Sequence, residues 1–213
     1  MKYNEYFKDI SNTSFSSFSE TSYLAIEKII SDRILIIDML NNVLNDELLI
    51  SKSECYDFLD KIICYSDEES SVYMRVSLFN DKYANRIHYH RWDYTACVLA
   101  GSYTQFLYGL HNENDITELF PYEPTYIEKH LPNNIYSLSH TMVHSVKAKP
   151  NTVSICIRGK AFGDKFQAID SKTNTSWWQY GSNIEASEER VMKSVSPVYL
   201  KGRIEHLISI LSV

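Results

Sequence analysis

The chain is short of glycine and proline, with 6 glycines and 5 prolines among 213 residues. Loops that cradle phosphate groups depend on closely spaced glycines, and neither G-x-G-x-x-G nor G-x-x-x-x-G-K occurs in the sequence. The shortage therefore excludes the common nucleotide-binding loops.

Cysteine is also sparse, and the four cysteines, Cys55, Cys64, Cys97 and Cys156, form no C-x-x-C pair. This spacing argues against a structural zinc finger and against a disulfide framework. The first residues lack a secretory apolar region, and no apolar run approaches the about 20 residues that span a bilayer. We expect a reduced, cytoplasmic protein with no membrane partner.

The chain has fewer basic than acidic residues, 21 against 27, so its formal net charge is −6. Binding to phosphate backbones needs a basic surface, so nucleic acid is not an expected partner. A small basic pocket inside the molecule remains compatible with this balance.

The hydrophobic pattern divides the chain into helical ends and a β-rich middle. Apolar residues recur at helical spacing over 21–45, and a second helix is predicted over about 52–64. Short strands are predicted from residue 70 onward, over 72–79, 85–92, 94–110 with a break at Gly101, 135–139, 142–148, 152–158, 165–169 and 176–180. Such strands are typical of a sandwich or barrel, and a last helix is predicted over 200–211.

We therefore predict a single domain with three parts. Residues 1–66 form an N-terminal segment with helices packed on a barrel, residues 67–185 form the barrel, and residues 186–213 form a helical tail. No flexible linker or internal repeat indicates a second domain.

Two of the seven histidines stand in the sequence His88-Tyr89-His90. Side chains alternate along a strand, so both imidazoles face the same way, as do Arg86 and Trp92 if the strand continues. Two imidazoles at this spacing can bind one metal ion, and a third ligand must come from another strand. The candidates are His144 and, in reserve, His140.

The segment from Arg86 to Gly101 resembles the first conserved motif of the cupin superfamily, in which a His-x-His pair is followed by a glutamate and a glycine. His88, His90 and Gly101 match this motif, and His144 resembles the single histidine of the second motif. The resemblance covers about residues 70–170. It implies a mainly β fold, a double-stranded β-helix or jelly-roll barrel, with the N-terminal and C-terminal helices outside it.

The sequence departs from the motif where most cupins have a glutamate ligand, because Tyr94 stands at that position. Asp93 is one residue away and, by alternation, faces the other side of the strand. A site of three histidines resembles that of cysteine-dioxygenase-like thiol dioxygenases. Three protein ligands leave positions open for substrate, which indicates a catalytic rather than a structural metal site.

The strand after the third histidine departs from those enzymes as well. They carry serine, histidine and tyrosine at alternate positions, whereas Ser154, Cys156 and Arg158 stand here. Thiol oxidation is therefore in question, but an inward guanidinium would bind a substrate carboxylate. Arg86 is a second candidate for that role.

These residues predict a metal-dependent cupin enzyme, first of all a non-haem Fe(2+) oxygenase or dioxygenase acting on a small carboxylate-bearing, amino-acid-like substrate. Zn(2+) or another divalent metal in an isomerase, lyase or rearrangement enzyme is the alternative, and a non-catalytic small-molecule-binding cupin is a third. Expected partners are the substrate and dioxygen, and the resemblance implies a possible homodimer. The predicted catalytic residues are Arg158, Tyr94 and Tyr103, and the predicted substrate-binding residues are Arg86, Arg158, Trp92, Cys156 and Ser154.

Overall fold

The computed structural model describes residues 2–80, 86–111, 115–181 and 184–212. Its helical segments lie at the two ends of the chain, apart from one short 3-10 turn in the middle. They are η1 (Asn4–Tyr6), α1 (Phe15–Ile30), α2 (Arg33–Val43), α3 (Glu47–Lys52), η2 (Ile116–Leu119), α4 (Ser187–Lys193) and α5 (Pro197–Leu211).

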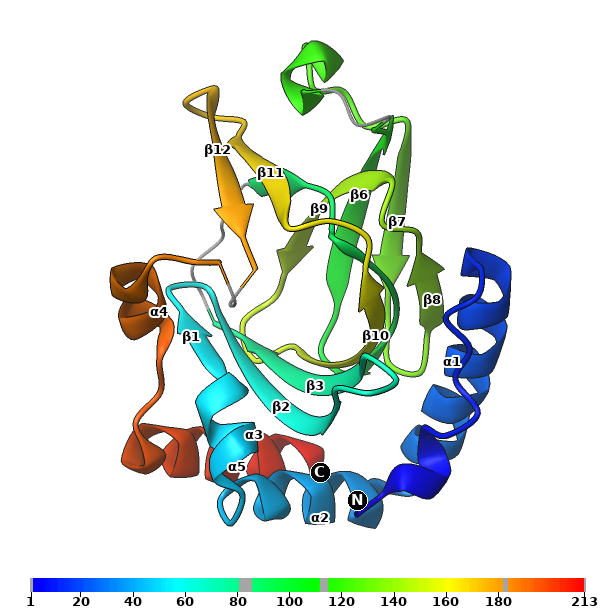
Figure 1. Cartoon of the computed structure of the whole chain (residues 1–213), viewed down its shortest axis with the longest axis vertical. Coiled ribbons are helices and arrows are strands. Elements are labelled where there is room, and N and C mark those ends of the chain that lie inside the picture. The colour runs from blue at the N-terminus through cyan, green and yellow to red at the C-terminus, as the bar shows by residue number, and fades with distance from the viewer. Residues whose placement is uncertain (1, 81–85, 112–114, 182–183, 213) are drawn as a thin grey trace.

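The strands form two antiparallel sheets of six strands each, which curve around a common interior (Figure 1). The first, here called sheet A, has the order β1-β2-β3-β10-β5-β8, and sheet B has the order β12-β11-β4-β9-β6-β7. The bounds of the strands are β1 (Glu54–Tyr56), β2 (Leu59–Asp67), β3 (Val72–Phe79), β4 (Arg86–His88), β5 (Trp92–Ala100), β6 (Tyr103–Leu110), β7 (Tyr126–His130), β8 (Ile135–Leu138), β9 (Met142–Ala148), β10 (Val153–Ala161), β11 (Lys165–Asp170) and β12 (Thr175–Tyr180). Sequential strands cross between the sheets, so the fold is the jelly-roll barrel that the resemblance to cupins implies.

The main apolar core lies outside the barrel, between sheet A and the helices. Alternate residues of β3 and β10, such as Met74, Val76 and Ile155, are fully buried against helical residues such as Ile26 and Leu207. Figure 1 shows α1, α2 and α5 beside this sheet. Because successive residues of a strand point to opposite faces, the other residues of the same strands point into the barrel.

Four α-helices begin at side-chain caps that the sequence provides, and the first cap is Ser14, which accepts a hydrogen bond from the backbone of Ser17 in α1. Asp32 accepts hydrogen bonds from the backbone of the first turn of α2, and Asp46 does the same for α3. Ser196 caps α5, where Pro197 occupies the first turn. The cap at Asp32 divides the helix predicted over 21–45 into α1 and α2.

The helix predicted over 52–64 is wrong. This stretch holds the end of α3 and the strands β1 and β2, which pair with each other from Glu54↔Lys61 to Tyr56↔Leu59. The barrel therefore begins at Glu54 rather than at residue 67, and the N-terminal segment is correspondingly shorter. Ile62 and Cys64 are buried against the helices and Leu59 is buried as well, so the spacing of these apolar residues also fits a helical pattern.

Two further differences concern single strands. β4 is shorter than the strand predicted over 85–92, whose first residue lies outside the described residues, and Trp92 instead starts β5. β7 lies at the edge of sheet B, in a stretch for which no strand was predicted. None of the helices in the described ranges is long and apolar enough to cross a membrane.

Candidate metal centre

His88, His90 and His144 converge on the inner face of sheet B. His88 on β4 is paired directly with His144 on β9, and His90 follows two residues after His88. Ile87 and Tyr89, which alternate with these two histidines along the chain, point the other way and join a small apolar cluster on the outer face. The two-residue period of the strand therefore separates packing residues from candidate ligands.

The three imidazoles lie close enough to act together. One ring nitrogen from each lies within 4.8 Å of the others, and His90 Nε2 is 3.0 Å from His144 Nε2. His88 Nδ1 is 3.1 Å from the backbone carbonyl oxygen of Arg86. A carbonyl can only accept, so Nδ1 carries the proton and Nε2 of His88 keeps its lone pair.

All three imidazoles are held in their neutral form. Burial lowers the pKa of His88 to about 4. Burial, reinforced by the neighbouring histidines, lowers the pKa values of His90 and His144 well below the usual value of 6.5. Neutral imidazole is the form that binds metals, so these rings are ligands at neutral pH without having to lose a proton.

The arrangement fits a divalent ion. Two nitrogens that bind the same ion at about 2.1 Å lie roughly 3 Å apart when their bonds to it are nearly perpendicular. The Nε2 atoms of His90 and His144 have that separation. His144 Nδ1 is buried and has no hydrogen-bond partner within the described residues, whereas its Nε2 lies within hydrogen-bonding distance of His90 Nε2. The Arg86 carbonyl orients His88 in the way that outer partners commonly orient metal-binding histidines.

His140, the reserve ligand, is held elsewhere. Its backbone N–H and its Nδ1 lie 2.7 and 2.8 Å from the same carboxylate oxygen of Asp93, and its ring stacks on Phe162. Asp93 is buried and faces away from the side occupied by Tyr94, as alternation predicts. The structure thus pairs these two residues outside the three-histidine cluster.

Tyr94, at the position of the usual glutamate, contacts the cluster through its ring. The ring centroids of Tyr94 and His90 are 4.8 Å apart at nearly a right angle. The Tyr94 hydroxyl interacts with that of Tyr136, which lies 2.6 Å from the hydroxyl of Tyr103. Burial raises the pKa values of Tyr94 and Tyr103 well above 10, so both predicted catalytic phenols are neutral hydrogen-bond donors.

Arg158 lies on the inner face of sheet A, between two aromatic rings. Its guanidinium carbon is 3.8 Å from the centroid of Tyr73 and 4.4 Å from that of Trp92. Trp92 in turn stacks on His90 at 5.7 Å. One indole ring therefore separates the guanidinium from the histidine cluster, and burial lowers the pKa of Arg158 to about 10.

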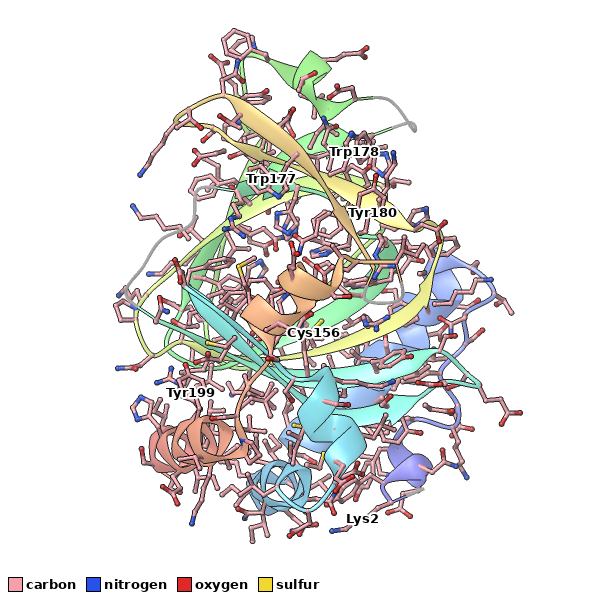
Figure 2. The ribbon with its side chains drawn as sticks, turned by 60° about the vertical axis from the view of Figure 1, so that its left-hand side comes forward. Lys2, Cys156, Trp177, Trp178, Tyr180 and Tyr199 are labelled. Atoms are coloured by element: carbon pink, nitrogen blue, oxygen red, sulfur yellow. The ribbon has the colours of Figure 1, made fainter. Side chains whose placement is uncertain are left out.

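Arg86 is directed to a different place. Its guanidinium lies over the rings of Phe58 and Trp177, at 4.7 and 5.5 Å. Trp177 belongs to β12, whose labelled aromatic residues appear above Cys156 in Figure 2. The Arg86 backbone, rather than its side chain, therefore contacts the candidate ligands.

Cys156 and Ser154 are both buried on β10, facing the interior. Cys156 pairs with Ala96 of β5 and with Arg75 of β3, and it packs beside Tyr94. Figure 2 shows Cys156 in the middle of the molecule, among the strands. Burial raises the pKa of its thiol, so the sulfur is protonated at neutral pH.

Sequence reasoning missed two cations on this inner face, Arg75 on β3 and Lys61 on β2. Arg75 lies opposite Cys156, and Lys61 lies opposite Ser77, which itself pairs with Ser154. The signal for Arg75 was present in the sequence, because Tyr73, Arg75 and Ser77 alternate with the buried apolar residues of the same strand. Lys61 was hidden by the wrong helix prediction.

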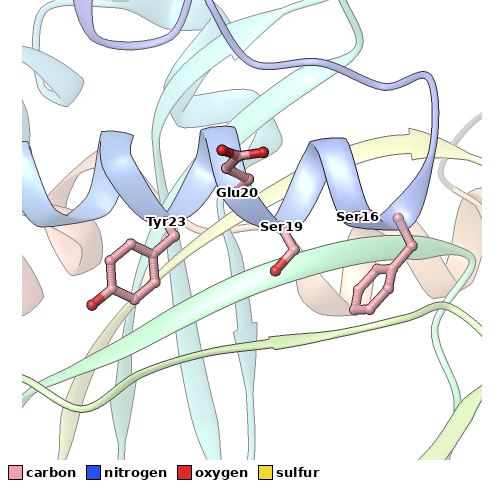
Figure 3. A pocket seen from close by; sticks show the side chains of 5 residues that line it. Ser16, Ser19, Glu20 and Tyr23 are labelled. Atoms are coloured by element: carbon pink, nitrogen blue, oxygen red, sulfur yellow. The ribbon is translucent and has the colours of Figure 1, made fainter.

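A hollow on the molecular surface lies along α1 and is separate from these residues (Figure 3). Its lining consists of Phe15, Ser16, Ser19, Glu20 and Tyr23, all from that helix. None of them was a predicted site residue. We assign this hollow no function.

No protein-family model matches the chain, and neither does any curated protein. Among solved structures, the chain is similar to ectoine synthase from P. lautus, with 8% identity, a TM-score of 0.42, and coverage of 70% of this chain and 94% of that one. It is also similar to an RmlC-like cupin from Shewanella frigidimarina, with 12% identity, a TM-score of 0.38, and coverage of 52% and 84%.

A third similar structure is YcfD, a ribosomal oxygenase from Escherichia coli, in complex with cobalt and 2-oxoglutarate. The identity is 15%, the TM-score is 0.36, and the match covers 44% of this chain but only 25% of that one. These likenesses concern the shape of part of the chain. The candidate site rests on the chain's own residues.

Proposed function

We propose that the protein is a metal-dependent enzyme in which His88, His90 and His144 hold one divalent ion. The observation that carries the proposal is the convergence of three neutral imidazoles on one face of the barrel interior. Three neutral rings with one nitrogen of each within 4.8 Å of the others bring their lone pairs together, and a shared metal ion would satisfy them.

Iron(II) is the first candidate for the ion, because imidazole-rich sites suit it and three protein ligands leave coordination positions free. When bound, such an ion supplies Lewis acidity and, if it is iron, the capacity to react with dioxygen. The remaining roles belong to the side chains. Trp92 and Tyr94 cover the His90 ring, and Arg158 offers a planar pair of donors to a carboxylate.

We propose a small carboxylate-bearing substrate that lies beside the histidines, with its carboxylate reaching the Arg158 guanidinium past the edge of the Trp92 ring. Neighbouring positions on the same inner face belong to Ser154 and Cys156, whose side chains would limit the size of the bound molecule. Holding the substrate beside the ion supplies the proximity that the reaction needs.

An isomerase or lyase using zinc is the second candidate, and the line of tyrosines favours it. Tyr94 is a neutral phenol in contact with the cluster, and its hydroxyl is linked through Tyr136 to Tyr103. A buried neutral phenol is suited to donating a proton to a reacting group. Such acid catalysis needs no oxidant, which separates this candidate from the oxygenase.

The test begins with elemental analysis of the purified full chain. We expect about one iron or zinc per chain, a loss of the metal in His88→Ala and in His144→Ala, and no loss in the matched variant His206→Ala. His206 is on α5, where its ring pairs with Asn151, away from the cluster. Metal far below one per chain in the unmodified protein would contradict the proposal and favour a non-catalytic binding protein.

Oxygen uptake separates the two enzymatic candidates. With iron reconstituted anaerobically, a set of small carboxylic acids is added and dioxygen is followed with an electrode. Uptake that depends on His88 and on the added acid supports the oxygenase. Conversion of an acid without oxygen uptake supports the isomerase or lyase.

A further inference from the structure

The inner face of sheet A carries more positive charge than one substrate carboxylate would neutralise. Lys61, Arg75 and Arg158 stand on the adjacent strands β2, β3 and β10, in register positions that face the interior. Arg75 shares a cross-strand row with Cys156 and Ala96, and Arg158 shares the next inward-facing row with Tyr94. The three cations therefore face the same region as the histidine cluster.

The nearby carboxylates are already matched by cations. Glu54 lies 3.5 Å from Lys61, and Glu185 pairs with Lys193. Within the part of the chain that the structure describes, neither Arg75 nor Arg158 forms an ion pair. The Nε of Arg75 is fully buried without a hydrogen-bond partner in that same part. Two guanidinium groups thus lack a counter-ion among the described residues.

Uncompensated charge in a low-dielectric interior is costly, and a bound anion relieves the cost. The arginines repel each other as well: their proximity contributes to the lowered pKa of Arg158. On the other side of the interior, three neutral histidines would leave the double charge of a metal ion uncompensated. One carboxylate would neutralise only a small part of the combined positive charge of the two arginines and the metal ion.

A further polar group lies on the same side as His144. Gln105 on β6 is almost completely buried and stands two residues before Leu107, which pairs with His144. Its side-chain oxygen has no hydrogen-bond partner among the described residues. This oxygen is a hydrogen-bond acceptor, so it is available to a donor group of a ligand in the interior and not to a carboxylate.

We infer that the substrate carries two anionic groups, one directed to the histidine side of the barrel and the other held by Arg75 and Arg158, so that the substrate class is a compact dicarboxylate. The inference rests on the proposed function for the role of the histidines. It adds Arg75 as a binding residue and assigns the second charge of the substrate to the arginine pair. The fork geometry of a guanidinium suits a carboxylate, and two such forks with different orientations fix its direction.

The probes are succinate and its mono-amide, succinamate, which differ in one charge and little in size. Binding to the full chain is measured by isothermal titration, with and without the reconstituted metal. With metal, we expect succinate to bind at least tenfold more tightly than succinamate. Without metal, both should bind weakly and equally, since the arginines hold one carboxylate of either.

The variants Arg75→Met and Arg158→Met should each weaken succinate binding at least tenfold, in the metal-free protein as well as with metal. Arg33→Met is the matched control, because it removes one arginine from α2 on the other side of sheet A and should change nothing. If Arg75→Met does not fold, Arg75→Lys keeps the charge without the fork and should still weaken binding measurably.

The outcomes separate the inference from the proposed function. Metal binding without arginine-dependent succinate binding, or equal affinity for both probes in the metal-loaded protein, overturns the inference and leaves the metal site intact. Arginine-dependent succinate binding in a protein that takes up no metal overturns the proposed function and supports the arginine site on its own. Discrimination that depends on both the metal and Arg75 supports both.

Discussion

Replacing Lys61 by methionine should make the folded protein more stable at neutral pH. The Lys61 side chain is 22% exposed, and its nearest carboxylate is that of Glu54 at 3.5 Å. Burial lowers the pKa of Lys61 from 10.5 to about 8, although the Glu54 carboxylate acts to raise it. The positive charges of Arg75 and Lys193 add to the lowering. The ring of Tyr56 also lies against this ammonium group, at 4.2 Å.

The size of the effect follows from the two pKa values. Each pH unit between them corresponds to about 1.4 kcal/mol, so keeping Lys61 charged in the folded protein costs about 3 kcal/mol at pH 7. Methionine has similar length and no charge, so Lys61→Met removes this cost. The variant also deprives Glu54 of one partner, which reduces the expected gain to roughly 2 kcal/mol.

The pH dependence has a definite sign. Below pH 8 both the folded and the unfolded protein hold the Lys61 proton, so the advantage of the variant is constant. Between about pH 8 and 10.5 the unfolded chain binds the proton and the folded protein does not, so the wild type gains stability relative to the variant as pH rises. The advantage of Lys61→Met should therefore shrink by about 1.4 kcal/mol per pH unit in this window.

The assay is urea unfolding of both proteins at pH 7, 8, 9 and 10, with the free energy of unfolding taken from linear extrapolation. Lys201→Met, which replaces a lysine that is 66% exposed on α5, serves as the control and should show no such trend. A difference between wild type and Lys61→Met that does not change from pH 8 to 10, or a variant less stable than the wild type at pH 7, would refute the reasoning.

Three other substitutions test the fold and the site. Gly101→Ala should lower the free energy of unfolding by about 2 kcal/mol in urea titrations, because Gly101 has φ +77° and an added Cβ would lie 2.6 Å from Thr152 Oγ1. Asp60→Asn should lower the thermal unfolding temperature, because it weakens the 2.7 Å contact with Arg203 that ties α5 to β2, and should leave the metal content unchanged. Tyr94→Phe keeps the ring against the cluster and removes the hydroxyl, so we expect unchanged metal content with slower turnover; loss of metal would assign Tyr94 a ligand role instead.

The β-rich middle of the chain could be predicted because its strands alternate cleanly. In β10, Ile155 and Ile157 face the helices while Cys156 and Arg158 face the interior, and this period of two is visible in the sequence. The convergence of the histidines followed from the same rule together with the motif spacing that Gly101 completes. The metal itself stays a prediction.

Other features could not be predicted, because short apolar runs do not distinguish a helix from a strand that is buried on one side. The run containing Leu59 and Ile62 satisfied both patterns, and only pairing with β1 and β3 decides between them. The partners of single side chains were equally hidden. Arg86 was expected toward the substrate, yet its guanidinium lies over Phe58 and Trp177, which are remote in sequence.

Sheet A is packed on its outer face by helices and lined on its inner face by polar and charged residues. The cohesion of the fold and the chemistry of the interior are therefore supplied by opposite sides of the same strands. An inward residue such as Ser154 could be exchanged with little effect on the contacts that Ile155 makes with the helices. A scaffold of this kind can acquire a new substrate by changing alternate positions along a strand, while the intervening positions continue to specify the fold.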